Sequence, residues 1–352
     1  MTVQVGVPLR GYTTLRLGGP ARRFVTASDA ASVVDAVRSC DLDGEPLLLL
    51  GGGSNLVIGD DGFDGTVVRV ASRGYAVDAS GVLTVEAGED WDEVVARAIE
   101  DGYGGLECLS GIPGLVGATP VQNVGAYGVE IADLLHGVDL LDRSTGSVVS
   151  LAASALGLGY RTSTLKNTDA AVVLRVRLGL RADGLSMPVR YAELARMLDV
   201  SLGARVPAAQ ARSAVLALRR GKGMVLDPSD HDTWSAGSFF TNPVLPDASL
   251  PAVLERIAAR VGDGVPVPQY PAGAGLTKLS AAWLIERAGF HRGHRGPGGR
   301  VALSSKHTLA LTNRGSASTA DLLALAREIA AGVHAAFAVD LHPEPVLVNC
   351  TL

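Results

Sequence analysis

Cysteine is scarce in this chain of 352 residues, which has only Cys40, Cys108 and Cys350. The three are odd in number and none belongs to a C-x-x-C pair, which argues against a disulfide framework or a zinc site. Long apolar runs are also missing: none approaches about 18 residues, and the start, MTVQVGVPLRGY, has no basic segment followed by an apolar core. These absences predict a cytoplasmic protein with no membrane anchor and no metal centre.

Charged residues are few as well, at 19% of the chain, where soluble domains have about 25%. The 31 basic residues are outnumbered by 36 acidic ones, and a net charge of −5 offers nucleic acid no general basic surface. We therefore expect no nucleic-acid partner. Lysines are rare among the basic residues, and the chain has only Lys166, Lys222, Lys278 and Lys306. A lysine in a glycine-rich loop is therefore of interest.

Glycine, by contrast, is abundant, with 43 residues, beside 17 prolines and 47% hydrophobic residues. At roughly 150 residues per domain, the length predicts two or three domains. Capping residues and apolar spacing predict helices over residues 28–40, 90–101, 208–220 and 319–337. Short apolar runs between turn residues predict strands over residues 46–50, 66–70, 82–87, 138–142, 147–151, 171–178, 301–304, 308–312 and 345–348. This mixture indicates an α+β protein.

A first glycine-rich loop, Gly51-Gly-Gly-Ser-Asn55, follows the strand predicted over residues 46–50. Without side chains in the way, glycine amides can converge on an anion such as a pyrophosphate. The Rossmann pattern fails because Leu56 replaces its third glycine and no helical spacing follows, and the Walker Gly-Lys-Ser/Thr is absent. Taken alone, the loop is equally compatible with a plain turn.

A second glycine-rich loop spans residues 110–128, SGIPGLVGATPVQNVGAYG. It combines glycines with polar donors, including Ser110, Thr119 and Asn123. A long polar loop inside a compact chain is more often functional than incidental, although a merely irregular connection is the alternative. Two such loops could hold one extended cofactor.

Further short motifs run along nearly the whole chain in a fixed order. Besides the two glycine-rich loops they are YTTLRLGGPA at 12–21, GYRTS at 159–163, VRYAEL at 189–194, GSFFTNP at 237–243, SKH at 305–307 and HPEP at 342–345. In this series the chain resembles the UDP-N-acetylenolpyruvoylglucosamine reductase (UDP-N-acetylmuramate dehydrogenase) family. Tyr191 lies in the insertion that marks the longer subtype of that family.

The resemblance implies an FAD-binding fold of the vanillyl-alcohol-oxidase (PCMH) type in two subdomains, plus a smaller α+β substrate domain. The expected boundaries are 1–70 joined by a C-terminal strand at 341–352, then 71–218, then 219–340. Many flavoproteins of this superfamily tether FAD through a histidine in the first loop. Ser54 stands there, so we expect noncovalent FAD. The implied cofactor contacts are Leu50, Gly51, Gly52, Gly53, Ser54, Asn55, Leu56, Ser110, Gly111, Gly117, Ala118, Thr119, Pro120, Asn123, Gly125, Ala126, Tyr127 and Gly128.

The resemblance also implies three catalytic residues for reduction of an enolpyruvyl ether in peptidoglycan precursor synthesis. Arg161 would stabilise the enediolate-like charge that forms when hydride reaches the methylene carbon. Ser238 would donate the proton to the α carbon. Glu344 would help to organise the enediolate, which requires a bridged carboxylate or a raised pKa. Next to Glu344, Pro345 stands where some relatives have Val.

For the substrate, UDP-N-acetylglucosamine enolpyruvate, the resemblance implies contacts from Tyr160, Tyr191, Lys222, Asn242 and His307. It also implies NADPH as reductant; this choice comes from the family alone, because the sequence has no separate nucleotide fingerprint. We expect a monomer. Two other readings remain open at this point: a flavin oxidase of the same superfamily, and a noncatalytic module that binds nucleotide sugars. His231, His291 and His294 have no metal-like partners and are expected at the surface.

Overall fold

The computed structural model describes residues 1–352 and divides the chain into two compact units. The first unit comprises Met1–Val7, Pro20–Gly53 and Phe63–Val225. The second comprises Pro8–Gly19, Ser54–Gly62 and Leu226–Leu352. The three-part division expected from the sequence stays a prediction, because this division separates compact cores and not ligand-binding functions.

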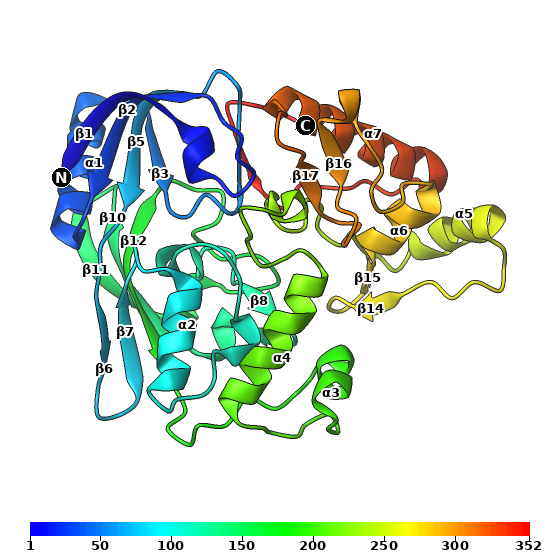
Figure 1. Ribbon diagram of the computed structural model, residues 1–352, viewed down its shortest axis with the longest axis horizontal. Helices are drawn as coiled ribbons and strands as arrows, with labels where there is room; N and C mark the ends of the chain where they lie inside the picture. Colours follow the sequence, from blue (N-terminus) through cyan, green and yellow to red (C-terminus); the bar gives the residue numbers. More distant parts are fainter. The chain divides into compact units, whose positions relative to one another are not determined.

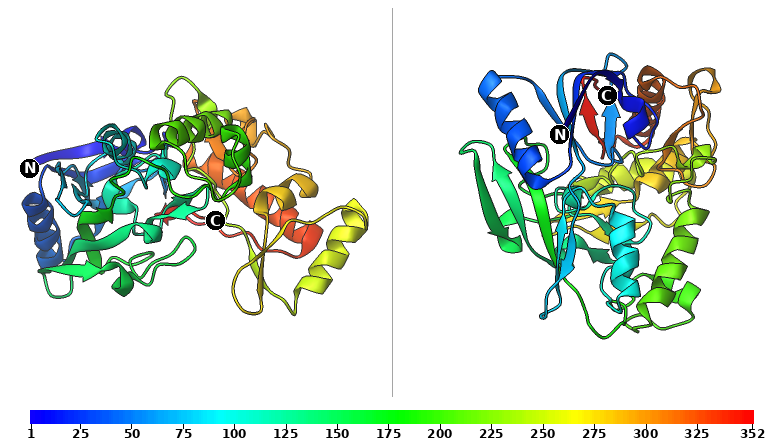
Figure 2. Two further views of the ribbon diagram at one scale, coloured as in Figure 1. Left: turned by 90° about the horizontal axis from the view of Figure 1, so that it is seen from below. Right: turned by 60° about the vertical axis from the view of Figure 1, so that its left-hand side comes forward.

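One sheet of the first unit has the strand order β1-β2-β5-β3, formed by β1 (Thr2–Pro8), β2 (Pro20–Ala27), β5 (Phe63–Val70) and β3 (Leu47–Leu50). Strands β2 and β3 both run parallel to β5. Helix α1 (Ala30–Asp43) packs along β2 and β5 with its valine face (Figures 1 and 2). Asp29 caps it by accepting from the Ser32 N–H, and Gly44 ends it in the left-handed region. Strand β3 then leads directly into the first glycine-rich loop.

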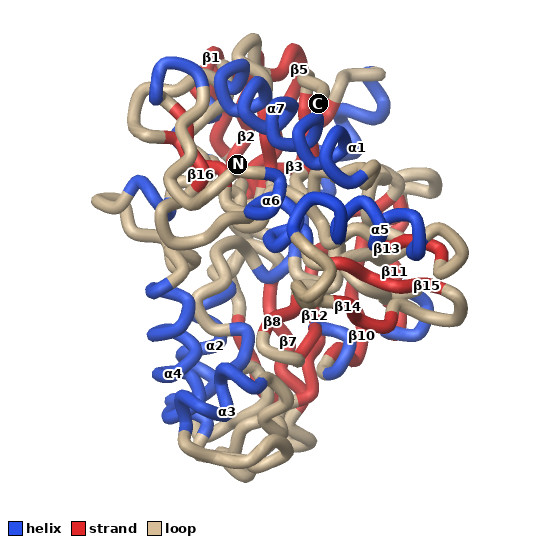
Figure 3. Tube along the Cα trace, turned by 90° about the vertical axis from the view of Figure 1, so that its right-hand side faces the viewer, coloured by secondary structure: helices blue, strands red, loops and turns tan.

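The other sheet of the first unit is antiparallel, in the order β11-β10-β12-β7-β6. Its inward residues share one apolar core with Trp91, which is fully buried and donates its ring N–H to the Leu109 carbonyl. Helices α2, α3 and α4 lie together within this unit (Figure 3). The bounds are β6 (Tyr75–Val77), β7 (Val82–Glu86), α2 (Trp91–Glu100), β8 (Gly125–Ala126), β9 (Val129–Glu130), β10 (Leu135–Asp142), β11 (Ser147–Ala152), β12 (Ala171–Gly179), α3 (Ala192–Leu198) and α4 (Ala208–Gly221).

The second unit is built around α7 (Thr319–Phe337), whose apolar face is buried against the hairpin of β16 (Val301–Leu303) and β17 (Leu311–Asn313) (Figure 1). A capping box of Ser318 and Asp321 begins the helix, and Asp60 accepts from the next two N–H groups. The other bounds are β4 (Leu56–Ile58), β13 (Val244–Pro246), α5 (Leu250–Val261), β14 (Gln269–Pro271), β15 (Leu276–Leu279), α6 (Ala281–Ala288) and β18 (Val346–Val348).

The chain's last strand, β18, pairs in parallel with β4, which directly follows the first glycine-rich loop. The absence of a helix after that loop, noted from the sequence, is therefore explained by a strand. Short 3₁₀ helices complete the structure at Leu9–Tyr12, Glu107–Leu109, Val116–Ala118, Ile131–Asp133, Ala153–Leu156, His231–Thr233 and Pro297–Gly299. None of the helices combines the length and apolar character that crossing a bilayer requires.

Candidate functional site

The two glycine-rich loops meet within the first unit. A Cβ placed on Gly52 would lie 2.7 Å from the Cα of Gly114, so a side chain there would force the loops apart. A Cβ on Gly117 would similarly lie 2.6 Å from the Cβ of Ala87. These glycines are needed for close backbone approach, which explains why neither position carries a side chain.

Backbone amides remain available where the loops meet. The N–H groups of Gly52 and Gly53 donate to no acceptor in the protein, and Gly53 is buried with a φ of 58°. Beside the second loop, the buried Nε of Arg219 also lacks a partner, while its Nη2 donates to the carbonyl of Gly111 at 3.3 Å. Buried donors normally find acceptors, so this region fits an anionic group such as the pyrophosphate of FAD.

The polar side chains of the second loop serve the protein itself. Ser110 donates its hydroxyl to the Glu107 carbonyl, and Thr119 donates to the Val116 carbonyl. Asn123 is fully buried and accepts from the Ala132 N–H through Oδ1. Their hydrogens are engaged within the protein, which leaves the loop's backbone and shape for a ligand. The cofactor contacts expected of these three residues stay a prediction.

The loop of residues 159–166, which carries Arg161, is fastened to the second glycine-rich loop by three hydrogen bonds. The Arg161 guanidinium donates to the Gly125 carbonyl at 2.8 Å. Asn123 Nδ2 donates to the Gly159 carbonyl at 2.9 Å, and Ser163 Oγ donates to the Val121 carbonyl at 2.5 Å. The predicted catalytic arginine therefore belongs structurally to the predicted cofactor loop.

Backbone strain gathers at the same place. Asn123, Tyr127 and Arg161 all have φ near +50°, in the left-handed region that non-glycine residues seldom adopt. Each such residue costs free energy that the surroundings must offset, and such residues concentrate at functional sites. At Arg161 a compensating contact is visible, because Lys166 Nζ donates to its carbonyl at 2.8 Å.

A second group of predicted residues meets at the turn between β8 and β9. Tyr127 packs edge to face with Tyr191, with ring centroids 5.6 Å apart, and Lys222 Nζ lies 5.9 Å from the Tyr127 centroid. Lys222 also pairs with Glu193 at 2.5 Å. Burial raises the pKa of Tyr127 to about 12, so its hydroxyl stays protonated. Tyr191 and Tyr160 are nearly half exposed, which leaves both available to a ligand.

Ser238 and Glu344 are brought together within the second unit by backbone pairing. Phe240 and Pro343 form an antiparallel bridge, and the Glu344 N–H donates to the Phe239 carbonyl at 2.8 Å. Pro345, which has no N–H, falls between this pairing and the next bond, from the Val346 N–H to the Asn55 carbonyl. Pro345 therefore marks the change of partner and leaves Glu344 in register with the segment after Ser238.

Asn242 follows Ser238 by four residues in the sequence, and His307 lies on a segment that is hydrogen-bonded to the residue after Ser238. Asn242 Oδ1 accepts from the Ala281 N–H at the start of α6. His307 is two residues before Leu309, whose carbonyl accepts from the Phe239 N–H at 2.7 Å. Arg161, Tyr191 and Lys222 belong to the first unit. Ser238 and Glu344 belong to the second unit, together with Asn242 and His307.

Sequence reasoning missed several supporting residues. Asp92 accepts from the Gly111 N–H at 2.6 Å and from both ends of the Arg212 guanidinium. Burial raises the pKa of the Asp92 carboxyl, but the bonds from Arg212 and Gly111 outweigh it and hold that pKa below its ordinary value. The carboxylate of the fully buried Glu107 accepts hydrogen bonds from the N–H groups of Gly105 and Met187. No sequence pattern marked these carboxylates, and the scarcity of lysine drew attention to Lys222 and not to Lys166.

Two smaller expectations concern histidines and metals. His231 was expected at the surface, but it is half buried and its ring packs on Trp234 with centroids 4.4 Å apart. The pattern gave no reason to expect this, because the contact depends on how a short 3₁₀ helix turns. No group of three or more His, Cys, Asp or Glu side chains in the structure could hold a metal ion.

Two family models match the chain. Residues 227–348 match the C-terminal domain of UDP-N-acetylenolpyruvoylglucosamine reductase. Residues 21–152 match an FAD-binding domain. The first match falls in the second unit and the second match largely in the first.

Whole-chain comparisons agree with these matches. The chain is 68% identical to the UDP-N-acetylenolpyruvoylglucosamine reductase of Saccharopolyspora erythraea, over 99% of this chain and 96% of that protein. It is 58% identical to that of Nocardia farcinica, over 100% and 91%. The crystal structure of the reductase from Thermus caldophilus matches with a TM-score of 0.67 and 27% identity, covering 99% of this chain and all of that one.

These findings confirm the predicted α+β fold with an FAD-binding domain, and membership of a reductase family excludes the oxidase and the noncatalytic module. The cofactor expected from the sequence is FAD, and the loops described above fit it. The chain belongs to the UDP-N-acetylenolpyruvoylglucosamine reductase family, FAD-dependent oxidoreductases of peptidoglycan precursor synthesis.

Proposed function

We propose that the enzyme uses NADPH to reduce the enolpyruvyl double bond of UDP-N-acetylglucosamine enolpyruvate, giving UDP-N-acetylmuramate. FAD, when bound and reduced, supplies the hydride that adds to the methylene carbon. The π electrons of the alkene then move toward the α carbon and the adjacent carboxylate, and a proton must follow to the α carbon. The residues of this chain have two tasks: to stabilise that charge and to deliver that proton.

Arg161 stabilises the developing enediolate charge. A guanidinium is always charged and presents two parallel N–H groups to a carboxylate, so it suits a charge spread over two oxygens. The support for this role is the fastening of its loop: bonds from Asn123, Ser163 and Arg161 itself join it to the glycine-rich loop. A donor fixed in advance stabilises charge without reorganising during the reaction.

Ser238 donates the proton to the α carbon. Serine is a weak acid, but the mismatch shrinks against a carbanion-like centre when the hydroxyl is held within hydrogen-bond reach. Glu344 organises the enediolate together with Arg161. The bond from the Glu344 N–H to the Phe239 carbonyl supports a joint role, because it fixes the glutamate's backbone next to the serine segment.

Four residues that the family resemblance points to bind the UDP part of the substrate. Tyr191, Lys222, Asn242 and His307 contact the diphosphate, and Tyr160 contacts the substrate beside Arg161. The exposure of Tyr160 and Tyr191 supports this assignment. Lys222, a point charge already paired with Glu193, can exchange that partner for a phosphate. NADPH and the sugar nucleotide react with the flavin in turn, which predicts parallel lines in double-reciprocal plots.

FAD binds noncovalently through the two loops, with contacts from residues 50–56 and 110–128. Residues 1–70, joined by 341–352, and 71–218 form the two FAD-binding subdomains, and 219–340 the substrate domain. The enzyme acts as a monomer in the cytoplasm. Ser54 in place of a tethering histidine supports the noncovalent binding. Acid precipitation should release the yellow colour into the supernatant, and colour retained in the washed precipitate would contradict noncovalent binding.

The observation that carries the proposal is the three-bond fastening of the Arg161 loop to the glycine-rich loop. The test is an anaerobic titration of the purified enzyme followed by flavin absorbance. NADPH should bleach the flavin, and enolpyruvyl sugar nucleotide should restore the colour in equimolar amount. Recovery with dioxygen alone, and none with the sugar nucleotide, would overturn the proposal.

A further inference from the structure

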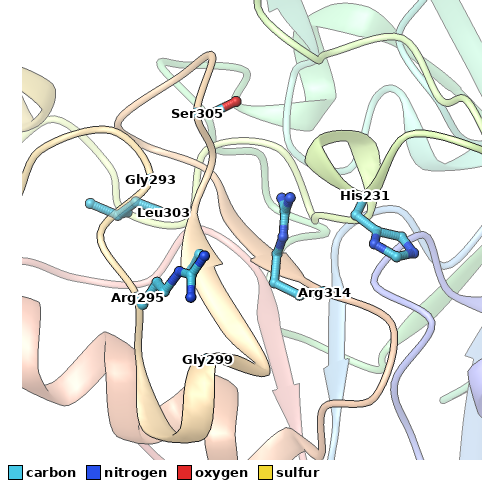
Figure 4. Close-up of a pocket in the computed structure, with 8 residues that line it drawn as sticks. His231, Gly293, Arg295, Gly299, Leu303, Ser305 and Arg314 are labelled. Carbon is cyan, nitrogen blue, oxygen red and sulfur yellow. The ribbon is translucent and has the colours of Figure 1, made fainter.

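A hollow of about 440 Å³ lies within the second unit, and none of the residues that line it is among the catalytic, cofactor or substrate residues assigned above. Its lining comes from four segments: the 3₁₀ helix that bears His231, the loop of residues 293–299, strand β16 together with Ser305 two residues after its end, and Arg314, which directly follows β17. Figure 4 shows Arg295 and Arg314 on different segments, with His231 beyond Arg314 and Ser305 at another edge. Two guanidinium groups thus share one small hollow.

The local sequence explains why the space is open. Arg295 bridges to Ala302, and Ala302 pairs in register with Thr312 on β17. Facing residues of antiparallel strands project to the same side, so Arg295, Ala302 and Thr312 share a face, and Arg314 follows two residues later on that face. Small side chains between two long cations leave a floor of alanine, and Gly299 contributes no side chain.

The charges in the hollow do not cancel. The Arg295 side chain makes no hydrogen bond or ion pair within the protein. Arg314 uses Nη1 to pair with Asp232 at 2.8 Å, while its Nε and Nη2 have no partner. Burial raises the pKa of Asp232, but Ser305 and Arg314 more than offset this, so that pKa lies below its ordinary value and the carboxyl is ionised. Two guanidinium charges against one carboxylate leave a net positive charge.

Asp232 does not block the hollow to an anion. Its two oxygens are taken by the Ser305 N–H, the Ser305 hydroxyl and Arg314, and its side chain is only 7% exposed. The carboxylate therefore acts as an anchor that fixes Arg314, with two N–H-bearing nitrogens of that guanidinium left over. Planar guanidinium forks match the geometry of phosphate oxygens, and an arginine without a partner in the protein breaks no protein hydrogen bond when it binds one.

We propose that this hollow, formed by Arg295, Arg314 and His231, is a binding site for a phosphate group, separate from the reaction site. The volume is at the lower end of the range for small-molecule pockets and holds a phosphate with a small attachment. Free inorganic phosphate and the phosphate of a nucleotide present the same chemistry to these residues. The test distinguishes the two sources.

The experiment measures thermal unfolding of the FAD-loaded enzyme in inorganic phosphate, against chloride at equal ionic strength. Phosphate should raise Tm by about 2–4 °C at saturation, as expected for a ligand that binds only the folded state. Arg295→Ala should remove this rise, and since Arg295 has no partner in the protein, the variant should fold. Arg292→Ala, an exposed neighbour paired only with Glu286 at 3.8 Å, is the matched control and should keep the rise.

Phosphate could also bind where the substrate diphosphate is proposed to bind. Lys222→Ala removes that contribution, and the shift that depends on Arg295 should persist in it. Adding AMP in place of phosphate tests the second source: a larger shift, again lost in Arg295→Ala, identifies a nucleotide ligand. Equal shifts in the Arg295→Ala and Arg292→Ala enzymes, or no shift in the unmodified enzyme, would overturn the inference. Neither outcome depends on whether the enzyme reduces an enolpyruvyl ether.

Discussion

Arg161 and the pair formed by Ser238 and Glu344 are held in different ways. Arg161 lies in a loop with a left-handed backbone, and side chains of its neighbours hold it. Ser238 and Glu344 lie on extended segments joined by backbone hydrogen bonds. Side-chain substitutions around Arg161 can therefore move it, whereas the serine and glutamate keep their backbone positions when side chains nearby change.

The difference separates two kinds of experiment. Replacing Ser238 tests its hydroxyl alone, because the hydrogen bonds that hold its segment against the Glu344 segment are made by the backbone. Replacing a neighbour of Arg161 tests how well the guanidinium must be positioned.

The largest expected effect near the loop comes from Arg161→Met. Reoxidation of reduced flavin by the enolpyruvyl substrate should slow by about 10²–10³-fold, as is typical when a donor to a developing oxyanion is removed. Reduction of the flavin by NADPH should change little. Stopped-flow absorbance measures both steps, and equal slowing of the two would show that Arg161 serves cofactor binding and not charge stabilisation.

A smaller effect is expected from Lys166→Met, which removes the ammonium group from the Arg161 carbonyl. We expect about a tenfold fall in kcat with little change in KM, since a misplaced guanidinium weakens transition-state interactions more than binding. Lys166→Arg keeps a charged donor and should restore most of the rate.

The matched control for this prediction is Arg256→Met, which removes an exposed cation from α5 in the other unit. It should leave kcat unchanged. If the Lys166→Met enzyme matches this control, or if Lys166→Arg fails to recover activity, Arg161 does not depend on that tether.

The smallest effect concerns Asp92, which ties Arg212 to the start of the second glycine-rich loop. Its pKa is lowered on folding, so it stabilises the protein above its ordinary pKa of about 4, and this stabilisation is lost as pH falls through the folded value. Asp92→Asn should cost about 1–2 kcal/mol of unfolding free energy at pH 7, and the difference from the unmodified enzyme should shrink below about pH 4. Urea unfolding at pH 7 and pH 3.5 measures this; a pH-independent difference would contradict it.

Much of the fold could be predicted from local sequence patterns. Helix α7 has the predicted bounds, because its Ser-Thr start and its apolar spacing are both strong signals. The predicted helices α1, α2 and α4 are confirmed within a few residues, as is the strand before the first loop. The strand predicted over 308–312 lies at Leu311–Asn313 instead, because residues 307–310 form a turn closed by the Ala310 N–H and the His307 carbonyl.

What could not be predicted depends on long-range contacts. Strand β2 carries two arginines and lacks the usual apolar alternation, so only its parallel pairing with β5 identifies it. Helices α3, α5 and α6 were not predicted from the sequence. They pack against apolar cores made of segments that are distant in the sequence. In the site, family motifs pointed to Arg161 and Glu344, but the fastening of residues 159–166 and the partner change at Pro345 are visible only in three dimensions.

The most direct test of the account is stopped-flow measurement of both half-reactions in Ser238→Ala, beside Ser238→Cys. The account predicts that NADPH reduces the flavin of Ser238→Ala at nearly the normal rate, while reoxidation by the enolpyruvyl sugar nucleotide slows by about 10²–10⁴-fold and Ser238→Cys recovers part of it. Reoxidation of Ser238→Ala at the rate of the unmodified enzyme would contradict the account, because the α carbon would then take its proton from another donor.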